Sequence, residues 1–130
     1  MSHFTTVKTK LRDLDCVKRA AEDLGLVLVE SEAPVEVRGF QGATEKSNLM
    51  IRATEHFDIG LKQTADGVEL MADWWGIEME TGLKEKDWVD RFNQRYAYHK
   101  VIKEVKSRGF ALEEESEENG ELKLTVRKWQ

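Results

Sequence analysis

Residues 57–75 read FDIGLKQTADGVELMADWW, and this stretch decides the fold. Apolar residues alternate with polar residues or glycine over positions 57–62. Over positions 68–75, Val, Leu, Ala and Trp alternate with Glu, Met, Asp and Trp. Such alternation is typical of a strand that buries one face. Asp66-Gly67 lies between the two runs and favours the tight turn of a hairpin. The stretch therefore predicts two neighbouring antiparallel strands.

The residues before this hairpin predict further strands and one helix. Four short segments favour strands: 4–11, 26–29, 35–40 and 48–52. Residues 13–25 have the capping aspartate, the apolar spacing and the glycine stop of an amphipathic helix. Residues 41–47 are polar and predict a loop.

The residues after the hairpin predict a long helix and a second hairpin. Positions 76–82 favour an irregular link, and positions 83–108 favour a helix that a glycine ends. The second hairpin turns at Asn119-Gly120, between strands near 110–112 and 122–126.

This order of elements determines the expected fold class. The connections are short, and there are too few helices to join every strand by a crossover, so the sheet should be antiparallel. We therefore expect the chain, residues 1–130, to form a single α+β domain in which an antiparallel sheet carries two helices packed on one face.

Composition predicts a cytoplasmic protein. A chain of 130 residues can bury a core of its own, and a lone Cys16 cannot form an internal disulfide. Positions 1–8 lack the apolar run of a signal peptide, and no segment approaches the roughly 20 apolar residues of a spanning helix. We expect no export signal and no association with a membrane.

The residues that could carry chemistry are scattered. His3, His56 and His99 have no second ligand one turn away, which argues against a metal site. Cys16 stands in the first turn of a helix, but its apolar neighbours predict a buried thiol rather than a nucleophile. Glycines do not form a phosphate loop. We expect neither a metal nor a cofactor.

Two adjacent tryptophans, Trp74 and Trp75, end the second alternating run. On a strand they would point to opposite faces, so only one could enter the core of a one-sided sheet. We expect the long helix to cover the other one. The alternative is a tryptophan exposed as a binding patch.

The long helix carries two apolar stripes. One stripe holds Trp88, Val89, Phe92, Tyr96 and His99, and the other holds Tyr98, Val101, Ile102 and Val105. The pattern predicts either a helix within the core or a helix of which one half contacts another chain. Between positions 84 and 108 it also carries eight Lys or Arg residues against four Asp or Glu.

Several segments together resemble a known family. They are the opening residues 1–10, Phe57-Asp58-Ile59-Gly60, residues 68–73, and Gln94-Arg95-Tyr96-Ala97-Tyr98 through Gly109-Phe110. They resemble the conserved hypothetical chloroplast open-reading-frame thirty-five family of cyanobacteria and plastids, which is also classed as a domain of unknown function. Residues 74–82 depart from the family pattern, which also admits a more distant bacterial or phage-borne relative. The resemblance implies an accessory protein, with partners that include a ring-forming ATPase and a small ferredoxin, and a stromal location in plastid relatives.

Three functions are compatible with these patterns. The leading one is an adaptor that binds a protein partner through a surface made of Arg95, Tyr98, His99, Trp74 and Trp75. The first alternative is a small-molecule or cofactor-binding enzyme that uses His99 as acid or base in a pocket lined by Tyr96, Tyr98 and Trp88. The second is a weak nucleic-acid binder that uses the basic helix 84–108, which the net charge of -5 disfavours.

Overall fold

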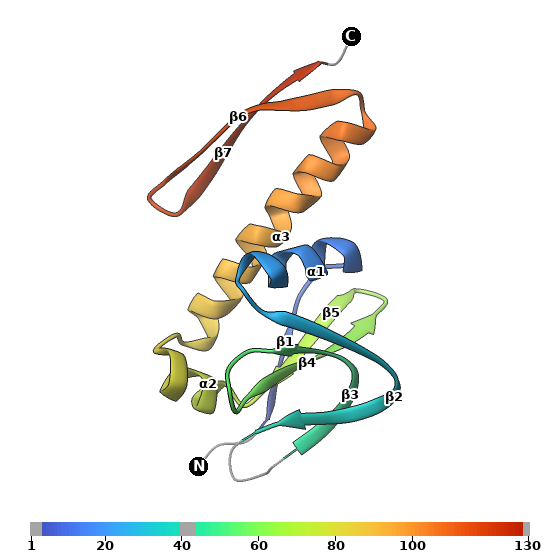
Figure 1. The fold of residues 1–130 in the computed structure, drawn as a ribbon, viewed down its shortest axis with the longest axis vertical. Coiled ribbons are helices and arrows are strands. Elements are labelled where there is room, and N and C mark those ends of the chain that lie inside the picture. Colours follow the sequence, from blue (N-terminus) through green and yellow to red (C-terminus); the bar gives the residue numbers. More distant parts are fainter. Residues whose placement is uncertain (1–3, 40–43, 129–130) are drawn as a thin grey trace.

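The computed structural model describes residues 4–39 and 44–128 (Figure 1). Its largest element is a five-stranded sheet with the strand order β1-β5-β4-β3-β2. The strands are β1 (Thr5–Lys8), β2 (Val27–Arg38), β3 (Thr44–Arg52), β4 (Asp58–Thr64) and β5 (Gly67–Ala72). Every neighbouring pair is antiparallel, which confirms the predicted sheet and the hairpin of β4 and β5.

The main core lies between one face of this sheet and the helices. The described residues form three helices, α1 (Leu14–Asp23), α2 (Trp74–Thr81) and α3 (Glu85–Ser107). Ile51, Ile59 and Leu70 of the sheet are fully buried together with Val17 of α1 and Phe92 of α3. The α+β class is therefore confirmed. Of the described helices, none is both long and apolar enough to cross a membrane.

Helix α2 corrects the sequence prediction for residues 74–82. We expected a strand up to Trp75 and an irregular link after it, and the protein forms a helix there instead. Asp73 caps this helix, because its carboxylate accepts a hydrogen bond from the backbone N of Gly76 at 3.1 Å. Gly82 ends the helix with a left-handed φ of 76°. The expected number of two helices was therefore too low.

The first half of the sheet also differs in detail from the prediction. Strand β2 is continuous where two strands were expected, and its pairing with β3 shifts register between Glu30 and Val35 to accommodate Pro34. Residues 41–43 of the expected loop lie outside the described residues. Residues 44–47 belong to β3 rather than to a loop. Figure 1 shows that β2 and β3 both bend strongly.

The second predicted hairpin forms next to α3. Strands β6 (Phe110–Glu118) and β7 (Glu121–Lys128) are longer than predicted, and they turn at Asn119 and Gly120, which both have positive φ. The hairpin contacts α3, and Figure 1 shows it beside the part of that helix which extends beyond the sheet. The two halves of α3 therefore have different neighbours.

Candidate functional site

The three α3 residues that the sequence proposed for an interaction surface gather around one carboxylate of α1. Oδ2 of Asp23 accepts from Nε of Arg95 at 2.9 Å and lies 2.6 Å from Nε2 of His99. The guanidinium of Arg95 lies over the ring of Tyr98, 4.5 Å from its centre. Burial raises the pKa of Asp23, but the hydrogen bonds from His99 and Arg95 outweigh it and lower that pKa.

Neighbouring contacts show what this cluster does for the fold. The hydroxyl of Tyr96 accepts from the backbone N of Arg12 and of Asp13. Nζ of Lys103 donates to Oδ2 of Asp13 at 2.7 Å. This bond lowers the pKa of Asp13 from 3.8 to about 2 despite the opposing effect of burial. These side-chain contacts hold α1 against α3.

The aromatic residues expected around His99 have separate roles in the structure. Trp88 and Tyr96 are buried in the core, and the ring of Trp88 stacks on Phe92 with 5.3 Å between centres. The ring of Tyr98 meets His99 edge-on, and a hydrogen bond to Glu115 of β6 raises the pKa of Tyr98. Tyr98 thereby links α3 to the second hairpin.

The two tryptophans of α2 have opposite environments. Trp74 is buried, and its ring lies 5.7 Å from that of Trp88 on α3. Trp75 is 49% exposed, and Met79, one helical turn later, is 56% exposed. An exposed tryptophan, the alternative that the sequence left open, is therefore what the structure contains. We call Trp75 and Met79 the α2 patch.

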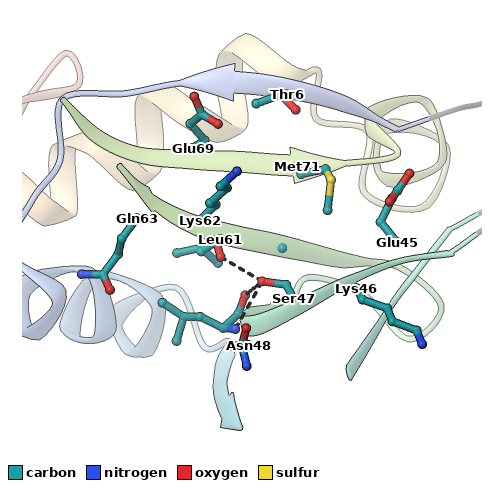
Figure 2. A pocket seen from close by; sticks show the side chains of 12 residues that line it. Thr6, Glu45, Lys46, Ser47, Asn48, Leu61, Lys62, Gln63, Glu69 and Met71 are labelled. Carbon is teal, nitrogen blue, oxygen red and sulfur yellow. Dashed lines mark hydrogen bonds between the residues drawn. The ribbon is translucent and has the colours of Figure 1, made fainter. Parts of the chain in front are cut away.

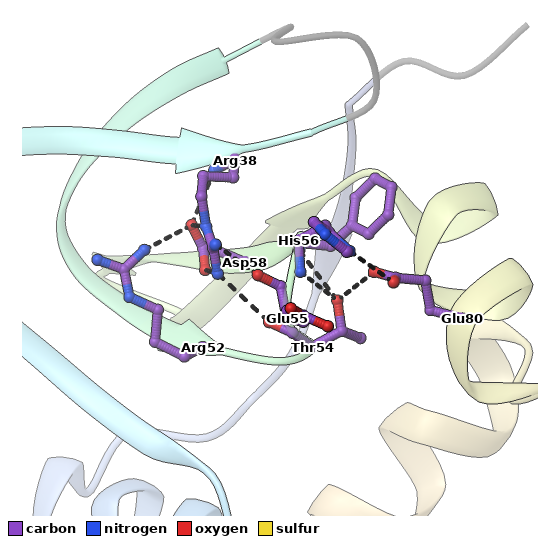
Figure 3. A network of polar contacts seen from close by, with 8 residues as sticks. Arg38, Arg52, Thr54, Glu55, His56, Asp58 and Glu80 are labelled. Atoms are coloured by element: carbon purple, nitrogen blue, oxygen red, sulfur yellow. Dashed lines mark hydrogen bonds and ion pairs between the residues drawn. The ribbon is translucent and has the colours of Figure 1, made fainter.

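A polar network fixes α2 to the turn before β4 (Figure 3). Glu80, near the end of α2, accepts from Oγ1 of Thr54 at 2.7 Å and lies 2.8 Å from Nδ1 of His56. The hydrogen bond with Glu80 raises the pKa of His56, and the same bond lowers the pKa of Glu80. Both partners of Glu80 lie far from it in the sequence, so local patterns do not reveal these contacts.

A buried carboxylate fixes the other side of the same turn. Asp58 is fully buried and accepts from Nε and Nη2 of Arg38, both at 2.9 Å, and from Nη1 of Arg52 at 2.8 Å (Figure 3). Arg38 also donates to the carbonyl of Glu55 at 2.6 Å. Burial raises the pKa of Asp58, but the hydrogen bonds from Arg38 and Arg52 lower it below its ordinary value. The turn and α2 are thus fixed to the sheet and to each other.

A cavity of about 590 Å³ lies on the sheet, between residues of β1, β3, β4 and β5 (Figure 2). Its lining includes Thr6, Glu45, Lys46, Lys62, Glu69 and Met71. Sequence patterns did not reveal this cavity, because it depends on which strands are neighbours and on how far β2 and β3 bend. We call it the sheet hollow.

One group of possible metal ligands occurs in the described part of the chain. Atoms of Asp13, Asp15 and Cys16 lie within 4.8 Å of one another. Asp13, however, is bound to Lys103, and burial raises the pKa of the Cys16 thiol. The group is thus explained by the cap of α1 and its ion pair.

The chain is similar to proteins that have no assigned function. A family model described as "Protein of unknown function (DUF1257)" matches residues 20–125. The uncharacterized protein ycf35 of Guillardia theta is 31% identical, and that of Pyropia yezoensis is 30% identical. In both cases the match covers 99% of this chain and 98% of the relative. The protein of the same name from Cyanophora paradoxa is 27% identical over the same shares. No solved structure matches the chain.

Proposed function

We propose, from the premise that this chain belongs to the DUF1257 family of proteins of unknown function, that it is a non-enzymatic adaptor which binds a protein partner through the α2 patch. Family membership confirms the resemblance noted in the sequence. The observation that carries the proposal is the exposure of two large apolar side chains, Trp75 and Met79, one helical turn apart.

These residue types suit a protein interface. Tryptophan and methionine are enriched in interfaces, and tryptophan is among the residues that most often dominate binding energy. Covering the remaining exposed area of an indole stabilises a complex by roughly 25 cal/mol for each Å² of apolar surface. The exposed half of the Trp75 side chain therefore offers apolar area to a partner.

The α2 patch is also held in place before any partner arrives. Trp74 anchors the start of α2 under α3, and Glu80 anchors its end to Thr54 and His56. A rigid patch loses little conformational entropy on binding, so more of its contact energy appears as affinity. This rigidity distinguishes α2 from an exposed loop that happens to contain a tryptophan.

Charge indicates which kind of partner fits. Residues 74–90 carry five carboxylates against two lysines. A complementary surface would place an apolar pocket for Trp75 within a rim of lysine or arginine. The ring-forming ATPase implied by the resemblance is the first candidate, and the cytoplasm or plastid stroma is the compartment that goes with this role.

Crosslinking in the source cell tests the proposal. A benzophenone amino acid introduced at position 75 should give one dominant adduct with another protein, while the same group at Lys106, exposed at the far end of α3, should not. Equal adducts at both positions, or none at position 75, would contradict the proposal. An adduct with a second copy of the chain would also contradict it, because the patch would then serve self-association.

A further inference from the structure

The strand register shows which residues lie in and beside the sheet hollow. Thr6 of β1 pairs with Met71 of β5, Met71 pairs with Gly60 of β4, and Gly60 pairs with Met50 of β3. This row crosses four strands, and the space over Gly60 is filled by neighbouring side chains, because a Cβ there would lie 3.0 Å from Cγ2 of Val37 and 3.3 Å from Cε of Met71. Met50 and Val37 are fully buried but do not belong to the main core, so the bent β2 and β3 enclose a second apolar layer beside the hollow.

A charged row runs next to the apolar one. Lys62 of β4 pairs directly with Glu69 of β5, and both line the hollow together with Glu45 and Lys46 of β3 (Figure 2). Among the residues that the structure describes, these four form no ion pair, whereas other charged residues of the chain do. The hollow thus presents the ammonium of Lys62 and the carboxylates of Glu69 and Glu45 beside the apolar side chain of Met71, while Lys46 points away from it (Figure 2).

We propose that the sheet hollow binds a small zwitterionic molecule. In this arrangement the carboxylate of the ligand meets Lys62, its ammonium meets Glu69 or Glu45, and its apolar part lies over Met71. Each ligand charge then has an opposite charge beside it, which favours such a molecule over a simple anion or cation.

The volume limits the size of this ligand. Small-molecule sites usually measure between several hundred and about a thousand cubic ångströms. The volume of the hollow, about 590 Å³, falls within that range. It can hold a free amino acid or a short peptide, and both present an ammonium and a carboxylate on an apolar skeleton. The inference uses no residue of the α2 patch, so it is independent of the proposed adaptor function.

An NMR titration of the ¹⁵N-labelled full chain tests the inference. The probes are L-leucine, the dipeptide glycyl-leucine, and N-acetyl-leucine amide, which has the same side chain without the charges. We expect the two zwitterions to shift the amide signals of Gly60, Lys62 and Glu69, and the neutral amide to leave them in place. Comparison of the first two probes shows whether an amino acid or a peptide fits better.

Variants then separate recognition by charge from adventitious contact. Lys62→Glu and Glu69→Lys should each weaken zwitterion binding at least tenfold, and the double exchange should restore it because both charges are present again. Lys18→Glu, on the exposed side of α1, is the matched control and should bind like the wild type. The inference fails if the neutral amide shifts the same signals equally, if no probe shifts them, or if the single exchanges bind normally.

Discussion

At the scale of single residues, we expect Asp13 to make the stability of the fold depend on pH. Its pKa of about 2 in the folded state lies below the ordinary 3.8, mainly because Lys103 donates to it. A carboxylate with a lowered pKa stabilises the fold above its unfolded pKa, and this contribution disappears as pH falls from about 4 to about 2. The shift from 3.8 to about 2 corresponds to at most about 2.5 kcal/mol.

Asp13→Asn isolates this contribution, since asparagine can still cap α1 but carries no charge. We expect a lower free energy of unfolding than in the wild type at pH 7, and a gap between the two that narrows as pH falls below 4. Urea unfolding followed by circular dichroism at several pH values measures both. If the difference in free energy of unfolding between the two proteins does not change with pH, the ion pair with Lys103 does not stabilise the fold.

Gly76 provides a prediction about whether a substitution stabilises or destabilises the protein. Alanine normally stabilises the interior of a helix relative to glycine by about 1 kcal/mol. A Cβ at position 76, however, would collide with the buried ring of Phe57. We therefore expect Gly76→Ala to destabilise the protein by about 1–3 kcal/mol, measured by urea unfolding. A more stable variant would mean that the ring of Phe57 is not packed on α2 in this way.

Residue contacts were the least predictable part of the molecule. Arg95, Tyr98 and His99 share one region of a helix by simple spacing, but Asp23, which binds Arg95 and His99, lies on a different helix far away in the sequence. Asp58 looked like an outward residue of an alternating strand. It is buried because Arg38 and Arg52, brought near by the sheet, satisfy its charge.

At the scale of elements, the two tryptophans of α2 should differ in their effect on stability. Trp74→Ala removes a buried ring from its contact with Trp88, which should cost about 3–5 kcal/mol. Trp75→Ala removes a half-exposed ring and should cost much less. Urea unfolding of both variants checks this contrast. Equal losses would contradict the different burial of the two residues.

Elements with strong local signals could be predicted, and those with mixed signals could not. Both hairpins follow from alternation around Asp66-Gly67 and Asn119-Gly120. Helix α2 was mistaken for a strand and a link, because the alternation of β5 continues in the sequence as far as Trp74. The capping side chain of Asp73 and the stop at Gly82 were the signals that mark the helix.

At the scale of the whole molecule, the second hairpin should be its least stable part. The helix α3 contributes to the described core only as far as Tyr96, and two-stranded sheets alone are marginally stable in water. Hydrogen exchange followed by mass spectrometry should therefore show rapid exchange in β6 and β7, and slow exchange in β4 and β5. Equal protection of both hairpins would show that β6 and β7 belong to the same cooperative unit.

The sheet hollow and the α2 patch belong to the scale at which sequence patterns say least. The hollow is lined by residues that the sheet brings together, Thr6 of β1, Met71 of β5, Gly60 of β4 and Glu45 of β3. That arrangement requires the strand order β1-β5-β4-β3, which no local pattern specifies. Likewise, Trp75 is exposed because Trp74 occupies the buried position against α3.

The measurement that tests the central claim most directly is the affinity of the protein for the partner crosslinked at position 75. Purified wild type, Trp75→Ala and Lys106→Ala should be titrated against that partner by calorimetry. We predict that Trp75→Ala weakens binding at least tenfold, equivalent to a loss of about 1.4 kcal/mol, and that Lys106→Ala binds like the wild type. Equal affinity of the wild type and Trp75→Ala would contradict the claim that the α2 patch binds the partner.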